Sequence, residues 1–160
     1  FQKKKWYTNK PVIIESHVSR EMLTIAVEKI YSTSVIICPE EIEDLVYERL
    51  SLMDTEVLPY ENNFILIDGE EVWTNDQFLA LDQPVTLIVN GQLILDGDVS
   101  EEALRSKVST LDVLGEVIVR EKKFKGILQN VIRLNTGTIE VEKGKEETGN
   151  TLQNIGELSL

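Results

Sequence analysis

Carboxylate side chains gather in two short segments of the chain, and their type and spacing could hold a divalent cation. One segment surrounds position 69, and the other has the sequence LDGDVSEE. Their acidic residues are Asp68, Glu70, Glu71, Asp96, Asp98, Glu101 and Glu102. The second segment has carboxylates at alternate positions but lacks the remaining ligands and the spacing of an EF-hand loop. Turn and helix-cap roles account for these residues, so we assign no metal ligand and no cofactor.

Nucleophilic and basic side chains occur near the N-terminus without forming a known catalytic pattern. Glu15, Ser16, His17 and Ser19 include an acid, two hydroxyls and a base, but neighbours in sequence rarely reach triad geometry. Cys38 is the only cysteine and follows an apolar run, which is typical of a small buried side chain. No phosphate-binding loop, dinucleotide fingerprint, metallopeptidase helix or nucleophile elbow is present. We therefore predict no catalytic residue and no enzyme.

The net charge of −12 is unevenly distributed along the 160 residues. Residues 1–20 carry +4, residues 21–102 carry −17 and residues 103–160 carry +1. The central acidic block repels phosphate backbones, so we predict no nucleic-acid partner. It is compatible with a cationic protein partner, and also with a solvated face that only keeps the fold soluble.

The N-terminal segment 1–18 combines lysines with Trp6 and Tyr7. Such a combination flanks membranes, so an anchor upstream of Phe1 is an alternative to a solvated arm that leads into a strand at residues 11–14. No apolar run is long enough for a membrane-spanning helix. Because the chain begins with Phe1, we expect a fragment of a larger protein. The sequence does not determine the compartment, and the cytoplasm is the favoured one.

Four glycine-centred segments recur at a near-constant interval. Their glycines, Gly69, Gly91, Gly115 and Gly137, follow one another about every 22 residues. A fixed period of this length indicates one supersecondary unit stacked on copies of itself. We predict an α/β repeat, a parallel strand-bend-strand-helix solenoid with units of about 22 residues. It is expected to form one domain over residues 19–160, preceded by an arm over residues 1–18.

The period is expected to continue beyond these four glycines. Val35 and Val57 are separated by the same interval and extend it upstream. Gly156 extends it downstream into a last unit that is incomplete. An incomplete unit leaves an apolar edge, which favours self-association through the C-terminal end.

A different fold also fits the glycines, namely an α+β sheet of hairpins with packed helices. The segments IDGE and VNGQ are signals for two-residue type I′ turns, which need positive φ. In the unit around Gly115, however, such a turn would mix charge with core on each face. A bend would instead point Leu111, Val113, Val117 and Val119 inward, and Asp112, Glu116 and Arg120 outward.

Helices are expected between the strands. Ser19 is the expected cap of the first helix, and an Asp98 to Glu101 capping box is expected to start the fourth. The linker over residues 120–130 is less helical because Gly126 interrupts it. The expected helices span residues 19–30, 40–50, 74–81 and 98–108.

The unit length and the strand-to-helix course resemble a leucine-rich repeat, with TLIV and TLDV as the candidate strands. The resemblance covers about residues 33–141. Leucine-rich repeats carry an asparagine or cysteine after the strand, and Gln92 and Glu116 occupy that position here. The resemblance implies a curved surface used for macromolecular contacts and no catalytic centre.

The favoured function is a non-enzymatic repeat scaffold or protein-binding module. One alternative is a metal-dependent or enzymatic domain that uses the acidic residues 68–102. Another is a structural subunit that assembles with copies of itself.

Overall fold

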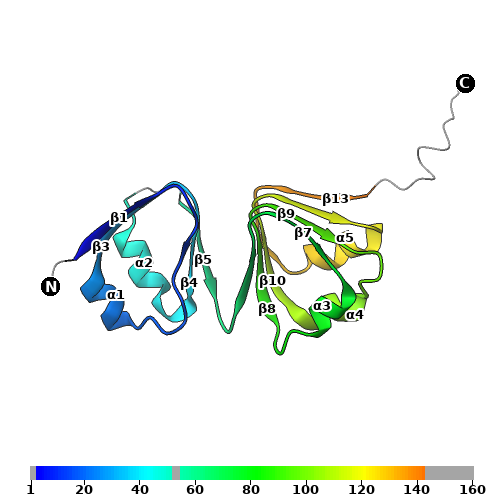
Figure 1. Cartoon of the computed structure of the whole chain (residues 1–160), viewed down its shortest axis with the longest axis horizontal. Helices are drawn as coiled ribbons and strands as arrows, with labels where there is room; N and C mark the ends of the chain where they lie inside the picture. The colour runs from blue at the N-terminus through cyan, green and yellow to red at the C-terminus, as the bar shows by residue number, and fades with distance from the viewer. Residues whose placement is uncertain (1–2, 52–54, 143–160) are drawn as a thin grey trace, which may run out of the picture. The chain divides into compact units, whose positions relative to one another are not determined.

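The computed structural model describes residues 3–51 and 55–142, and the chain divides into two compact units, Phe1–Asn63 and Phe64–Leu160. We call them the N-terminal and the C-terminal unit (Figure 1). This division differs from the predicted arm over residues 1–18 followed by one repeat domain over 19–160. The arm differs because its residues Lys4–Thr8 form a strand that pairs within the N-terminal unit. The predicted last unit around Gly156 lies outside the described residues.

The C-terminal unit contains two four-stranded sheets in which every pairing is parallel. Sheet 1 has the order β12-β10-β8-β6, and sheet 2 has the order β13-β11-β9-β7. The strands of sheet 1 are β6 (Phe64–Ile67), β8 (Val85–Val89), β10 (Val108–Val113) and β12 (Ile132–Asn135). Those of sheet 2 are β7 (Glu70–Trp73), β9 (Gln92–Leu95), β11 (Glu116–Val119) and β13 (Thr138–Val141). The predicted α/β class with parallel strands is confirmed.

Each glycine-centred segment passes from sheet 1 to sheet 2. The strands before and after Gly91, for example, are β8 and β9, which lie in different sheets. None of the six glycines in the described residues has the positive φ that a type I′ turn needs. The hairpin alternative is therefore wrong for these segments, and the chain bends at the glycines.

The bends of successive units stack directly on one another. The amide of Gln92 donates to the carbonyl of Gly69 at 2.8 Å, and the amide of Glu116 donates to that of Gly91 at 2.9 Å. A Cβ added at Gly91 would overlap the backbone of Gly69 and lie 2.6 Å from the carbonyl oxygen of Asp68. A side chain does not fit between two backbones that approach so closely, so the period of the glycines is the period of the stack.

Three helices complete the C-terminal unit: α3 (Asn75–Leu79), α4 (Glu101–Lys107) and α5 (Lys122–Gln129). They lie side by side, on the side of the unit away from the bends (Figure 1). Thr74 and Gln77 form a capping box on α3. Helix α4 is capped by Ser100, whose side chain accepts from the amide of Ala103, so the predicted Asp98 cap is wrong.

Helix α5 forms despite the glycine in its middle, which corrects the expectation that Gly126 would interrupt it. Phe124, Ile127 and Leu128 of this helix are buried. Burying three such side chains contributes several kcal/mol, whereas one glycine in a helix costs about 1 kcal/mol. Gly126 itself has no atom within 4 Å of an added Cβ, so it lies on the open side of the helix.

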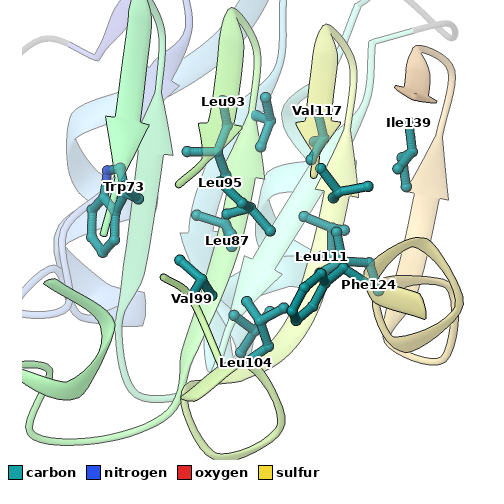
Figure 2. Packing of buried hydrophobic residues seen from close by; sticks show 14 of the residues in the cluster. Trp73, Leu87, Leu93, Leu95, Val99, Leu104, Leu111, Val117, Phe124 and Ile139 are labelled. Atoms are coloured by element: carbon teal, nitrogen blue, oxygen red, sulfur yellow. The ribbon is translucent and has the colours of Figure 1, made fainter. Parts of the chain in front are cut away.

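The core of the C-terminal unit lies between the two sheets and the helices (Figure 2). Every inward position predicted for the segment around Gly115 is fully buried, namely Leu111, Val113, Val117 and Val119. Trp73 packs against Phe78 of α3 with ring centroids 5.0 Å apart. Within the C-terminal unit, the apolar side chains of each strand-bend-strand-helix segment therefore pack against those of the neighbouring segments.

The N-terminal unit also combines parallel strands with helices. Strand β1 (Lys4–Thr8) pairs with β3 (Val27–Ser32), and β4 (Ile36–Pro39) lies between β2 (Val12–Ile13) and β5 (Val57–Tyr60). The helices are α1 (Arg20–Ala26), the 3₁₀ turn η1 (Glu40–Ile42) and α2 (Glu43–Arg49). Ile36 lies opposite Val57, one residue after the Val35 that extends the predicted interval upstream.

The first helix is shorter than predicted. It begins after Ser19, whose hydroxyl accepts from the amide of Met22 at 3.1 Å, and this confirms the predicted cap. It ends at Ala26, and Val27 and Ile30 enter the core from strand β3 instead. Both residues are β-branched, and in this stretch strand pairing prevails over the helical spacing of the apolar residues.

Candidate interaction surface

Several of the acidic residues considered as cation ligands have separate structural roles. Asp68 accepts from the side-chain amide of Asn90 at 2.8 Å, and Asp98 accepts from the backbone amide of Asn75 at 3.1 Å. Glu101 and Glu102 lie exposed in the first turn of α4, where their negative charges interact favourably with the helix dipole. Among residues 3–51 and 55–142, no three His, Cys, Asp or Glu side chains come together in a way that could hold a metal ion.

The residues considered for nucleophilic chemistry differ in their exposure. Cys38 is fully buried in the core of the N-terminal unit, as predicted. Glu15, Ser16 and His17 are all exposed, and Ser19 caps a helix. A thiolate nucleophile needs access to its substrate, which the fully buried Cys38 lacks.

The outer face of sheet 2 presents side chains in regular rows. Leu93 and Val117 lie opposite each other in the core, so the residues that alternate with them point away from it. Parallel register places equivalent residues of successive strands side by side. The row nearest the bends, which we call the polar row, contains Glu70, Gln92, Glu116 and Thr138. The next, which we call the apolar row, contains Val72, Ile94 and Ile118 and ends at Glu140.

The polar row contains a hydrogen bond between neighbouring units. The side-chain amide of Gln92 donates to the carboxylate of Glu116 at 2.7 Å. These two residues occupy the position that the resemblance assigns to the asparagine of a leucine-rich repeat. Gln92 and Glu116 are thus joined across two neighbouring strands of sheet 2.

The apolar row consists of β-branched side chains that the sheet leaves accessible. Val72 is 50% exposed, and Ile94 and Ile118 are partly exposed between their neighbours. The continuous row was not predicted from the sequence. The available signal was that the three positions recur at the same interval as the glycines.

Charged groups border the apolar row on both sides. The polar row supplies Glu70 and Glu116, and the residues just after the strands supply Asp96, Arg120 and Glu142. Arg120 forms an ion pair with Glu142, as neighbours across β11 and β13. Carboxylates therefore outnumber the single guanidinium around the row, and the face is acidic. Glu116 is partly exposed and Arg120 exposed, so both point outward as predicted.

Asp112 does not point to solvent, and this corrects the prediction for it. Its carboxylate is fully buried in sheet 1 and receives two hydrogen bonds from Arg133, one of them 2.9 Å long. A buried carboxylate needs such a partner, because taking an unpaired charge out of water is very costly. Arg133 lies on the neighbouring strand β12, and the signal in the sequence was an arginine about one repeat after the aspartate.

Comparison of the chain with known protein families, with curated proteins and with solved structures finds no match. Within the described ranges, none of the helices has the length and apolar character needed to span a membrane.

Proposed function

We propose that this chain is a non-enzymatic repeat scaffold that binds a protein partner, and that its C-terminal unit is a parallel solenoid. The proposal rests on the exposed apolar row of Val72, Ile94 and Ile118 on the outer face of sheet 2. A row of this kind, bordered by charged and polar groups, has the composition of an interface core with a polar rim. Binding of a partner that removes this apolar surface from water would be favourable.

The rim selects the chemistry of the partner. Glu70, Glu116 and Asp96 border the row with negative charge, so the partner carries lysine or arginine next to an apolar strip. Charge complementarity of this sort directs the encounter and sets the orientation, whereas the buried apolar contacts contribute most of the affinity. The partner is therefore an amphipathic segment with a basic margin.

Selection from a displayed peptide library tests the proposal. The selected peptides are expected to combine apolar and basic residues. They are expected to lose binding to the double variant Ile94→Thr/Ile118→Thr, which keeps β-branched side chains but removes apolar surface. Leu79→Gln is the matched control, because Leu79 is 48% exposed on helix α3, away from sheet 2. Peptides that bind the double variant as well as the parent protein would contradict the proposal, provided the variant's melting temperature is unchanged.

A further inference from the structure

The outer face of the β1–β3 pair in the N-terminal unit is basic and aromatic. Lys5 lies opposite Lys29, and Tyr7 lies opposite Tyr31. Lys5 also forms an exposed ion pair with Glu28 of β3 at 3.8 Å, which leaves Lys29 and the exposed lysines of β1 to make the face basic. The two tyrosine rings stack with centroids 4.5 Å apart and planes 2° from parallel. Trp6 packs on the core from the other face of β1, so the lysines and tyrosines share one face.

Within the described part of the N-terminal unit, this aromatic stack ends at the edge strand. Tyr31 is half-buried, whereas Tyr7 is 70% exposed. The outer side of the Tyr7 ring faces the position where an added strand would place the next ring. The ring spacing is close to the distance between neighbouring strands, so an aromatic residue on an added strand would continue the stack.

The backbone of β1 can accept such a strand. The carbonyl of Thr8 accepts from the amide of Thr33, which places the backbone groups of Thr8 on the β3 side. Backbone groups alternate in direction along a strand, so those of Lys5 and Tyr7 point to the opposite side. Among the described strands of the N-terminal unit, β1 pairs with β3 alone.

An apolar cavity of about 180 Å³ lies next to this edge. Its lining includes Trp6 of β1, Ile13 of β2 and Met22 of α1. Ile13 is 44% exposed and Met22 is 47% exposed. Since a cavity of roughly 150 Å³ holds a benzene ring, this one has room for a large apolar side chain.

We propose that the edge of β1 binds an extended acidic segment of a partner protein as an added strand. One face of that segment places carboxylates beside Lys5 and an aromatic ring on Tyr7, and its other face places an apolar side chain in the cavity. Main-chain hydrogen bonds would supply affinity and alternate side chains specificity, as in other complexes formed by strand addition. Exposed lysines at positions 3, 4, 5 and 10 oppose pairing between two copies of this edge but favour an acidic strand.

A labelled peptide of alternating valine and glutamate with one central tyrosine is the probe, and fluorescence anisotropy measures its binding. A peptide with lysine in place of glutamate is the control and is expected not to bind. Tyr7→Ala is expected to weaken binding about twofold to twelvefold, because a stacked aromatic pair contributes roughly 0.5–1.5 kcal/mol. Tyr7→Phe is expected to bind like the parent protein. Lys5→Glu is expected to abolish binding, whereas the same change at the exposed Lys122 of the C-terminal unit is expected to have no effect.

Amide hydrogen exchange supplies a second readout that ordinary surface attraction would not change. The amides of Lys5 and Tyr7 are expected to gain protection on peptide addition, because the added strand would accept from them. The proposal is overturned if acidic and basic peptides bind with the same affinity. It is also overturned if the amides of Lys5 and Tyr7 exchange as fast with the peptide bound as without it. It is also overturned if anionic vesicles or a single-stranded oligonucleotide bind this face and the acidic peptide does not. The site lies in a different unit from the outer face of sheet 2, so the two proposals fail separately.

Discussion

The side-chain amide of Gln92 donates a 2.7 Å hydrogen bond to the carboxylate of Glu116, which holds the same position in the next unit of the chain. The bond joins two stacked units across their outer face, beside the apolar row. It keeps Glu116 in place at the margin of the proposed interaction surface.

Removing either partner of this bond is expected to cost about 1 kcal/mol of unfolding free energy. In a double-mutant cycle with Gln92→Ala and Glu116→Ala, we expect a coupling energy of roughly 0.5–1.5 kcal/mol, because the two side chains are in direct contact. Urea denaturation measures it. Additive effects of the two changes would show that the bond does not stabilise the stack.

Alanine at the stacked glycines is expected to destabilise the C-terminal unit. A Cβ at Gly115 would overlap the backbone of Gly91 and lie 2.7 Å from the carbonyl oxygen of Asn90, and backbone cannot move aside cheaply. We expect Gly115→Ala to cost about 3 kcal/mol or more. Gly69→Ala is the matched control, since an added Cβ there meets no atom within 4 Å. Denaturation followed by Trp73 fluorescence in a Trp6→Phe background reports on this unit, and equal losses at Gly115 and Gly69 would refute the close-approach argument.

Gly126→Ala is expected to have the opposite sign. This glycine lies inside helix α5, and an added Cβ meets nothing within 4 Å. Alanine is favoured over glycine in a helix interior by about 1 kcal/mol, so the variant should be more stable by roughly that amount. Thermal melting checks it. A lower melting temperature would mean that the open side of α5 is not open.

Breaking the pair between Asp112 and Arg133 is expected to cost much more than breaking a surface ion pair. Arg133→Met leaves the fully buried carboxylate of Asp112 without its bidentate partner, and such losses amount to about 3–5 kcal/mol. The double variant Asp112→Leu/Arg133→Met removes both charges and should recover part of the loss. Chemical denaturation of the three proteins checks this, and a double variant less stable than the single one would contradict it.

The pair of Arg20 and Asp44 is expected to make stability pH-dependent in acid. The hydrogen bonds from Arg20 lower the pKa of the Asp44 carboxyl from 3.8 to about 2. A lowered pKa in the folded state means that the contribution is present above the unfolded value of 3.8 and is lost as the pH falls through about 2. The difference in stability between the parent protein and Arg20→Gln should therefore shrink between pH 4 and pH 2. A stability difference that stays constant over this pH range would argue against the pair. Added salt should reduce the stability difference, because both side chains are exposed.

Much of the architecture could be predicted from the sequence because it depends on local chemistry repeated at a fixed interval. The glycines mark the bends, since only glycine fits between backbones as close as those of Gly91 and Gly69. Alternation along the strands identified Leu111, Val113, Val117 and Val119 as core. A bulky side chain at a stacked glycine, or a charge at an inward strand position, would disturb the repeats on both sides of it.

Other features depend on what lies across from a residue in the next unit, and local chemistry does not contain that information. The alternation that assigned Asp112 to solvent was correct about its face of the strand, but Arg133 of the neighbouring strand makes its burial tolerable. The first helix ends at Ala26 because Val27 and Ile30 are needed as strand residues beside β1, a pairing that no local spacing announces.

The candidate surfaces follow the same division. The sequence by itself determined that outward positions recur on successive strands at the interval of the glycines. Only the tertiary structure decided that Val72, Ile94 and Ile118 form one continuous row, because parallel register sets which residues become neighbours. The stacking of Tyr7 on Tyr31 depends on register in the same way, since the two residues are far apart along the chain and adjacent only across the sheet.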